Sequence, residues 1–213
     1  MRNLIFTIFI AFTTFSVFAQ TSSPQSKEIL DKTYNIYTQS KGVGFDFNVK
    51  TSNGKSTSSQ KGNVMAKGNK FRVTMPGMST WFDGKTQWVL LRDNNEVNVS
   101  TPSQAEIASI SPIALMSMYK SGYNLKNPVS KIVSRKAAWS IELTPVKKGD
   151  FSKIIVAVDK KSYQLLQING YQQNGVTNTI NVVSYNDKNN FDDAIFSFSK
   201  RNYPNVEVID LRE

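Results

Sequence analysis

The chain has 213 residues, with 26 Lys and Arg against 16 Asp and Glu, and with neither Cys nor His. The absence of Cys and His excludes thiolate and imidazole metal sites, Cys or His nucleophiles and Ser-His-Asp triads. Composition therefore argues against catalysis before any motif is considered.

The N-terminus is typical of a cleavable secretory signal. Arg2 precedes an uncharged apolar run over residues 4–18, and Ala19 stands before the polar Gln20. This run is shorter than the ~20 residues that span a bilayer, which argues against the alternative of a membrane anchor. We expect a signal peptide over residues 1–19 and a single domain over residues 20–213, whose core must stabilise it without disulfides.

Basic residues are spread along the whole chain. Loss of Arg2 with the signal lowers the formal net charge from +10 to +9, and pairs such as Lys147-Lys148 and Lys160-Lys161 stand next to turn residues. This spacing favours a solvated surface, with attraction to acidic partners or an anionic membrane as the alternative. No nucleic-acid-binding motif is present, so we expect no nucleic-acid partner.

Residues 26–37 predict an amphipathic helix of about three turns. Ile29, Leu30 and Tyr37 fall at helical spacing, and Ser26 stands where an N-cap is expected. The apolar stripe of this helix should face the rest of the fold.

Residues 45–100 predict roughly six antiparallel strands in a meander. Phe71 and Val73 alternate with polar residues, and this period of two places large apolar side chains on one face of a strand. Asp83-Gly84, between two aromatic runs, predicts a tight hairpin turn.

Residues 103–119 predict a second helical segment. Ser103 and Glu106 have the spacing of a capping box. Residues 107–119 carry no charge and are too few to span a bilayer, so protein or a ligand must cover their apolar surface. Pro112 predicts a kink or two short helices in place of one rod.

The rest of the chain predicts roughly five more strands, one of them over residues 195–198, and an extended end over residues 203–212 that closes over a sheet edge. The predicted fold class is mainly β with helices (α+β), an unclosed antiparallel β-barrel of about eleven strands with a helical lid or plug. Helices that pack permanently would make a closed core. Helices that lift would expose an apolar pocket.

Composition favours the pocket, although ordinary core packing explains any single residue. Met adapts to irregular apolar partners, and Trp and Phe supply broad apolar walls. The predicted cavity residues are Phe45, Phe47, Met65, Phe71, Val73, Met75, Trp88 and Trp139. The predicted inner face of the lid consists of Ile107, Ile110, Ile113, Met116 and Met118.

A set of short motifs covers nearly the whole mature chain. They are Gly62, the strand Phe71 to Pro76, Asp83-Gly84-Lys85-Thr86-Gln87-Trp88, the Val97/Val99 strand with the capped helix after it, Leu143-Thr144-Pro145, Phe196-Ser197-Phe198 and residues 206–212. This set resembles the periplasmic outer-membrane lipoprotein carrier family, LolA. The resemblance implies a periplasmic monomer without a cofactor. It would bind the acyl chains of lipoproteins released by an inner-membrane ABC transporter and pass them to an outer-membrane acceptor.

One departure from the family pattern bears on mechanism. Family members carry an Arg before a Pro in the strand after the Gly62 equivalent, where it bonds the lid shut, whereas this chain has Lys67-Gly68-Asn69. Lys67 and Arg72 are the candidate substitutes. Acyl binding is therefore a firmer expectation than the way in which the lid is held shut.

The expected function is that of a non-enzymatic carrier. The alternative is a binding module of the same fold that senses or stores another apolar ligand or lipid in the cell envelope, or takes part in envelope stress signalling. An enzyme is the weaker option because Asp83, Asp93, Asp150 and Asp159 stand at turns, where local backbone hydrogen bonding explains them.

Overall fold

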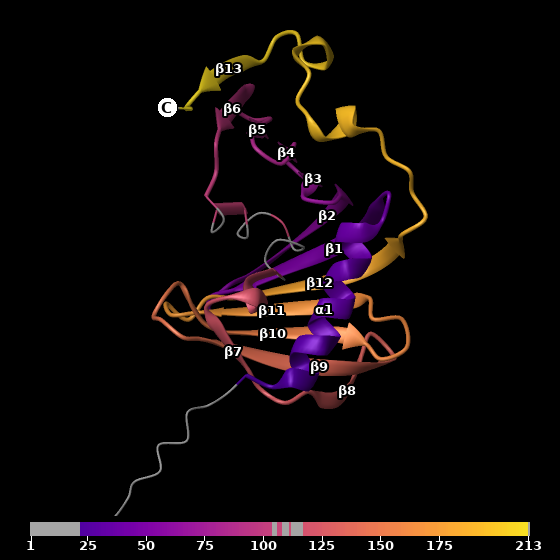
Figure 1. Ribbon diagram of the computed structural model, residues 1–213. Helices are drawn as coiled ribbons and strands as arrows, with labels where there is room; N and C mark the ends of the chain where they lie inside the picture. The colour runs from indigo at the N-terminus through magenta and orange to yellow at the C-terminus, as the bar shows by residue number, and fades with distance from the viewer. Residues whose placement is uncertain (1–21, 104–105, 108–110, 112–116, 213) are drawn as a thin grey trace, which may run out of the picture.

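The computed structural model describes residues 22–103, 106–107, 111 and 117–212, and it is dominated by one sheet of 13 strands (Figure 1). The strands are β1 (Val43–Ser52), β2 (Thr57–Lys67), β3 (Lys70–Met75), β4 (Met78–Phe82), β5 (Gln87–Leu91), β6 (Glu96–Ser100), β7 (Tyr123–Leu125), β8 (Val129–Val133), β9 (Lys136–Pro145), β10 (Phe151–Asp159), β11 (Leu165–Gln172), β12 (Thr177–Asn186) and β13 (Glu207–Asp210). The helical elements are α1 (Pro24–Gln39) and the 3-10 turns η1 (Met118–Lys120), η2 (Asp193–Phe196) and η3 (Lys200–Asn202). The expected signal peptide lies outside the described residues.

The sheet runs in the order β13-β6-β5-β4-β3-β2-β1-β12-β11-β10-β9-β7, and β8 also pairs with β9. Its two ends are not joined by hydrogen bonds, so the predicted fold class of an unclosed, mainly antiparallel barrel is confirmed. The extra strands come from short pieces such as β7 and from β13, which pairs with β6 in parallel. The C-terminal segment thus covers the β6 edge of the sheet, as expected for an otherwise exposed edge.

Helix α1 crosses the inner face of the sheet in front of β1 and β9–β12 (Figure 1). It begins three residues earlier than Ser26 suggested, because Ser23 is the N-cap and accepts a hydrogen bond from the Ser26 backbone while Pro24 occupies the first turn. Leu30 and Tyr37 are buried against the sheet, and the Tyr37 hydroxyl accepts a hydrogen bond from the Leu165 backbone at 3.2 Å. No helix in the described ranges combines the length and hydropathy needed to cross a membrane.

The two faces of the sheet hold separate apolar clusters. The inner cluster joins α1 to residues such as Phe45 and Val156. On the outer face of β4–β6, Trp81 packs against Phe198 and Tyr203, with ring centroids 5.8 Å apart in each case. The C-terminal segment therefore covers the outside of the same strands that β13 extends.

The strand predicted over residues 195–198 is wrong. Residues 193–196 form the 3-10 turn η2 instead. Asp192 accepts a hydrogen bond from the Ala194 backbone at 2.8 Å and starts this turn, while Phe196 is fully buried against Phe191. A short apolar run with a capping Asp before it thus forms a turn in place of a strand.

Candidate functional site

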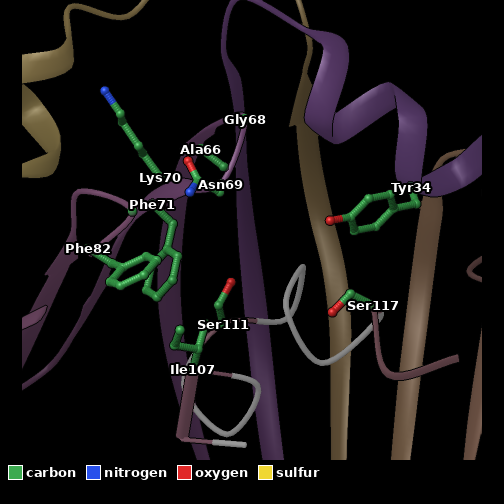
Figure 2. A pocket seen from close by; sticks show the side chains of 11 residues that line it. Tyr34, Ala66, Gly68, Asn69, Lys70, Phe71, Phe82, Ile107, Ser111 and Ser117 are labelled. Atoms are coloured by element: carbon green, nitrogen blue, oxygen red, sulfur yellow. The ribbon is translucent and has the colours of Figure 1, made fainter. Parts of the chain in front are cut away.

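A cavity of about 120 Å³ lies between the inner face of β2–β4 and the segment that follows β6 (Figure 2). Figure 2 shows the rings of Phe71 and Phe82 on one side, with Ile107 and Ser111 beneath them and Tyr34 of α1 across the space. The remaining lining residues are Ala66, Gly68, Asn69, Lys70, Gly84 and Ser117. Three parts of the chain that are distant in sequence therefore enclose one small space.

The sheet wall of the cavity is set by strand register. Phe71 in β3 lies directly opposite Phe82 in β4, so both side chains stand on the same face. Their rings are 5.2 Å apart and only 4% and 5% exposed. Alternation along β3 then places Val73 and Met75 on this face as well.

The segment over the cavity begins with the predicted capping box. Ser103 Oγ accepts a hydrogen bond from the Glu106 backbone, and the Glu106 carboxylate accepts one from the Ser103 backbone at 2.7 Å. The Ser103 hydroxyl also donates to the Glu106 carboxylate at 2.7 Å. This bond and the one from the Ser103 backbone hold the pKa of Glu106 below its usual value. Ile107 and Ser111 are linked by an i to i+4 backbone hydrogen bond, and both line the cavity. The predicted kink at Pro112 lies outside the described residues.

The far end of this segment is anchored to α1. The Tyr119 hydroxyl donates to Asp31 Oδ1 at 2.6 Å, and the Lys120 ammonium lies 3.5 Å from the centre of the Tyr34 ring. Burial raises the pKa of Asp31, but hydrogen bonds from Lys27 and Tyr119 outweigh it and hold that pKa below its usual value. This end of the segment is therefore tied to α1.

Two tight turns meet at the rim of the cavity. Asp83 Oδ1 accepts hydrogen bonds from the backbones of Lys85 and Thr86, as the predicted hairpin requires. Gly84 has a φ of +102°, and a Cβ there would stand 2.8 Å from Asn69 Nδ2 in the β2–β3 turn. The backbone angle therefore favours glycine at residue 84, and any other residue would also have to displace the Asn69 side chain.

The basic residues near the rim bind the C-terminal segment. Lys67 and Lys70 contact the two oxygens of Asp193 at 2.8 and 2.6 Å, and they hold the pKa of that carboxyl at about 2. Arg72 stands on the outer face with its guanidinium 5.3 Å from the Trp81 ring. Among the described residues, Lys67 thus contacts the C-terminal segment and Arg72 contacts the outer face.

The structure brings most of the predicted cavity residues to the inner face. Phe45, Phe47, Phe71 and Val73 are buried in the inner cluster, and Met75, Trp139 and Met118 pack against it half-buried. Ile107 is buried over the cavity. Ile110, Ile113 and Met116 lie outside the described residues.

Met65 and Trp88 stand on the other face of the sheet from these residues. Met65 is paired with Arg72, and Trp88 is paired with Trp81, whose ring packs on the C-terminal segment. Directly paired residues share a face, so neither belongs to the inner wall. The prediction of Met65 and Trp88 rested on side-chain size and apolar character, which do not show the face of the sheet on which a residue lies. Counting the register from Phe71 across the turn at Gly77 would have identified Phe82 instead.

Comparisons with known proteins give a consistent result. A family model described as outer membrane lipoprotein carrier protein LolA matches residues 15–172. The structure of an uncharacterized conserved protein from Thermus thermophilus is 15% identical, with a TM-score of 0.63 over 87% of this chain and 99% of that chain. A LolA superfamily protein from Nitrosomonas europaea is 12% identical, with a TM-score of 0.45 over 81% of this chain and 97% of that chain. No curated protein matches the chain.

Proposed function

Because the chain belongs to the outer membrane lipoprotein carrier protein family LolA, we propose that it is a periplasmic carrier of acylated lipoproteins. It binds their acyl chains in the hollow of the sheet, receives them from an inner-membrane ABC transporter and delivers them to an outer-membrane acceptor. The carrier acts as a monomer and carries out no catalysis.

The cavity under the segment after β6 is the observation that supports this proposal. Its volume of about 120 Å³ is close to the ~150 Å³ that admits a benzene-sized molecule and well below the ~300 Å³ of ordinary ligand sites. This conformation is therefore a closed one. An acyl chain enters when Ile107 and Ser111 move away from Phe71 and Phe82.

Burial of an acyl chain would offset the contacts that this movement breaks. Each buried methylene contributes about 0.8 kcal/mol, so ten of them contribute about 8 kcal/mol before the costs of association. That amount exceeds the few kcal/mol expected from the contacts of Tyr119 and Lys120 with α1. A bound chain can therefore hold the segment open, and its removal lets the segment close.

A reversible cross-link tests whether this movement is required. The chain has no Cys, so Asn69→Cys and Ser111→Cys would place the only two thiols at the rim and on the covering segment, both lining the cavity. Joined by a reducible bismaleimide, they should block uptake of a fluorescent dodecanoyl probe, and reduction should restore it. The two single-Cys variants treated in the same way are the controls. Undiminished uptake by the cross-linked protein would refute the proposal.

A further inference from the structure

On the inner face of the described sheet, three buried side-chain oxygens have no hydrogen-bond partner: those of Thr80, Gln87 and, farther along the sheet opposite Phe45, Tyr185. Thr80 is 0% exposed and its hydroxyl oxygen is unpaired, and Gln87 is 7% exposed with an unpaired Oε1. Buried polar groups are nearly always paired, because leaving one unpaired costs free energy. Thr80 and Gln87 are neighbours on the face that carries Phe82, although neither lines the closed cavity itself. Two neighbouring exceptions there suggest that a ligand supplies the partners when the hollow is open.

Strand register places both side chains next to the cavity wall. Gln87 in β5 lies directly opposite Phe82, and Thr80 in β4 lies directly opposite Val73 in β3. Direct partners share a face of the sheet at about 5 Å between Cβ atoms, so both polar groups face the same hollow as Phe71 and Phe82. Thr80 has Val73 and Val89 as its direct neighbours on that face, whereas Gln87 lies between Phe82 and Ser100.

The two groups differ in what they need from a ligand. The Oε1 atom of Gln87 only accepts hydrogen bonds, so its partner must be a donor, whereas the Thr80 hydroxyl can donate to a carbonyl. A hydrocarbon chain satisfies neither group, and an ester offers an acceptor without a donor. A secondary amide carries an N–H beside a C=O and satisfies both.

We infer that Thr80 and Gln87 bind an amide group that joins the acyl chain to the rest of the ligand. The preferred ligand is then an amide-linked acyl chain whose linkage enters the hollow together with the hydrocarbon. This inference rests on the proposed function, since it needs residues 103–120 to admit a chain. The two polar groups would make the pocket select ligands by their linkage as well as by the apolar area that they bury.

A matched pair of probes tests the inference. N-dodecanoylglycine methyl ester carries the amide, and the analogue with oxygen in place of the N–H is an ester of the same length. Competition against a fluorescent dodecanoyl probe should show that the mature protein binds the amide about threefold to tenfold tighter than the ester, the gain expected from one net hydrogen bond.

Two variants and a control assign this preference to the named residues. Gln87→Met should abolish the preference, because only the amide has an N–H to donate to Oε1. Thr80→Val should weaken both probes about equally, because both carry the carbonyl that accepts from the hydroxyl. Thr80→Val should not lower Tm, since it removes an unpaired buried hydroxyl. Thr74→Val is the control and should keep the preference, because Thr74 is paired with Ser79 on the opposite face.

The possible results distinguish failure of this inference from failure of the proposed carrier function. Equal binding of the two probes by the unaltered protein, or a preference retained in Gln87→Met, would overturn the role of Gln87. Unchanged binding of both probes by Thr80→Val would overturn the role of Thr80. Either result would leave the carrier proposal intact. A marked fall in Tm for Thr80→Val would also overturn it, by showing that the hydroxyl stabilises the fold. Failure of both probes to bind would instead refute the carrier proposal.

Discussion

Removal of the Tyr119 hydroxyl should accelerate ligand uptake. This hydroxyl donates a hydrogen bond to Asp31 Oδ1 at 2.6 Å and so holds the end of the segment after β6 against α1. A hydrogen bond to a charged group contributes about 1.5–3 kcal/mol. The lower end applies here, because Asp31 is partly solvated and also pairs with Lys27. About 1.4 kcal/mol is a factor of ten, so Tyr119→Phe should raise the open population, and the uptake rate that depends on it, about tenfold.

Stopped-flow fluorescence with a dodecanoyl probe measures this rate. Tyr123→Phe is the matched control, because Tyr123 lies a few residues away in β7, opposite Pro145 of β9. An uptake rate for Tyr119→Phe within twofold of the unaltered protein would refute the reasoning. Equal acceleration in Tyr123→Phe would attribute the effect to general loosening of the region.

Three further perturbations test other parts of the account. Phe71→Ala should lower the free energy of unfolding by about 3–5 kcal/mol, measured by urea titration, because Phe71 is only 4% exposed. It should also weaken probe binding. An unchanged urea midpoint would contradict the burial of Phe71. Deletion of residues 207–213 should cause self-association in size-exclusion chromatography by uncovering the edge of β6, and a strictly monomeric product would contradict that role. Asp193 has its pKa lowered from 3.8 to about 2 by Lys67 and Lys70, so its ion pairs stabilise the fold above about pH 4 and are lost as the pH falls towards 2. The Tm difference between the unaltered protein and Asp193→Asn should therefore shrink over that range, and a difference independent of pH would count against this linkage.

Local sequence patterns predicted the sheet well because strands and turns have short-range causes. Asp83-Gly84 forms the expected turn, because the Asp83 carboxylate accepts a hydrogen bond from the Lys85 backbone and Gly84 adopts the positive φ. The alternation of Phe71 and Val73 likewise placed both on the buried face. The C-terminal segment was less predictable, because η2 depends on packing of Phe196 that residue preferences do not encode.

The candidate site was only partly predictable for a different reason. Trp88 has the large apolar side chain expected of a cavity residue, yet its position opposite Trp81 places it on the outer face. Register counting from Phe71 through two hairpins would have corrected this and also identified Phe82. Tyr34 joins the cavity only through the packing of α1, and no pattern in the sequence indicates that contact.

Native mass spectrometry of the mature protein taken from the periplasm, followed by lipid extraction, tests the central claim most directly. The account predicts an acylated molecule bound one-to-one, released when the protein is denatured. An unliganded mass, together with no uptake of a fluorescent acyl probe, would contradict it and would mean that residues 103–120 close the hollow permanently.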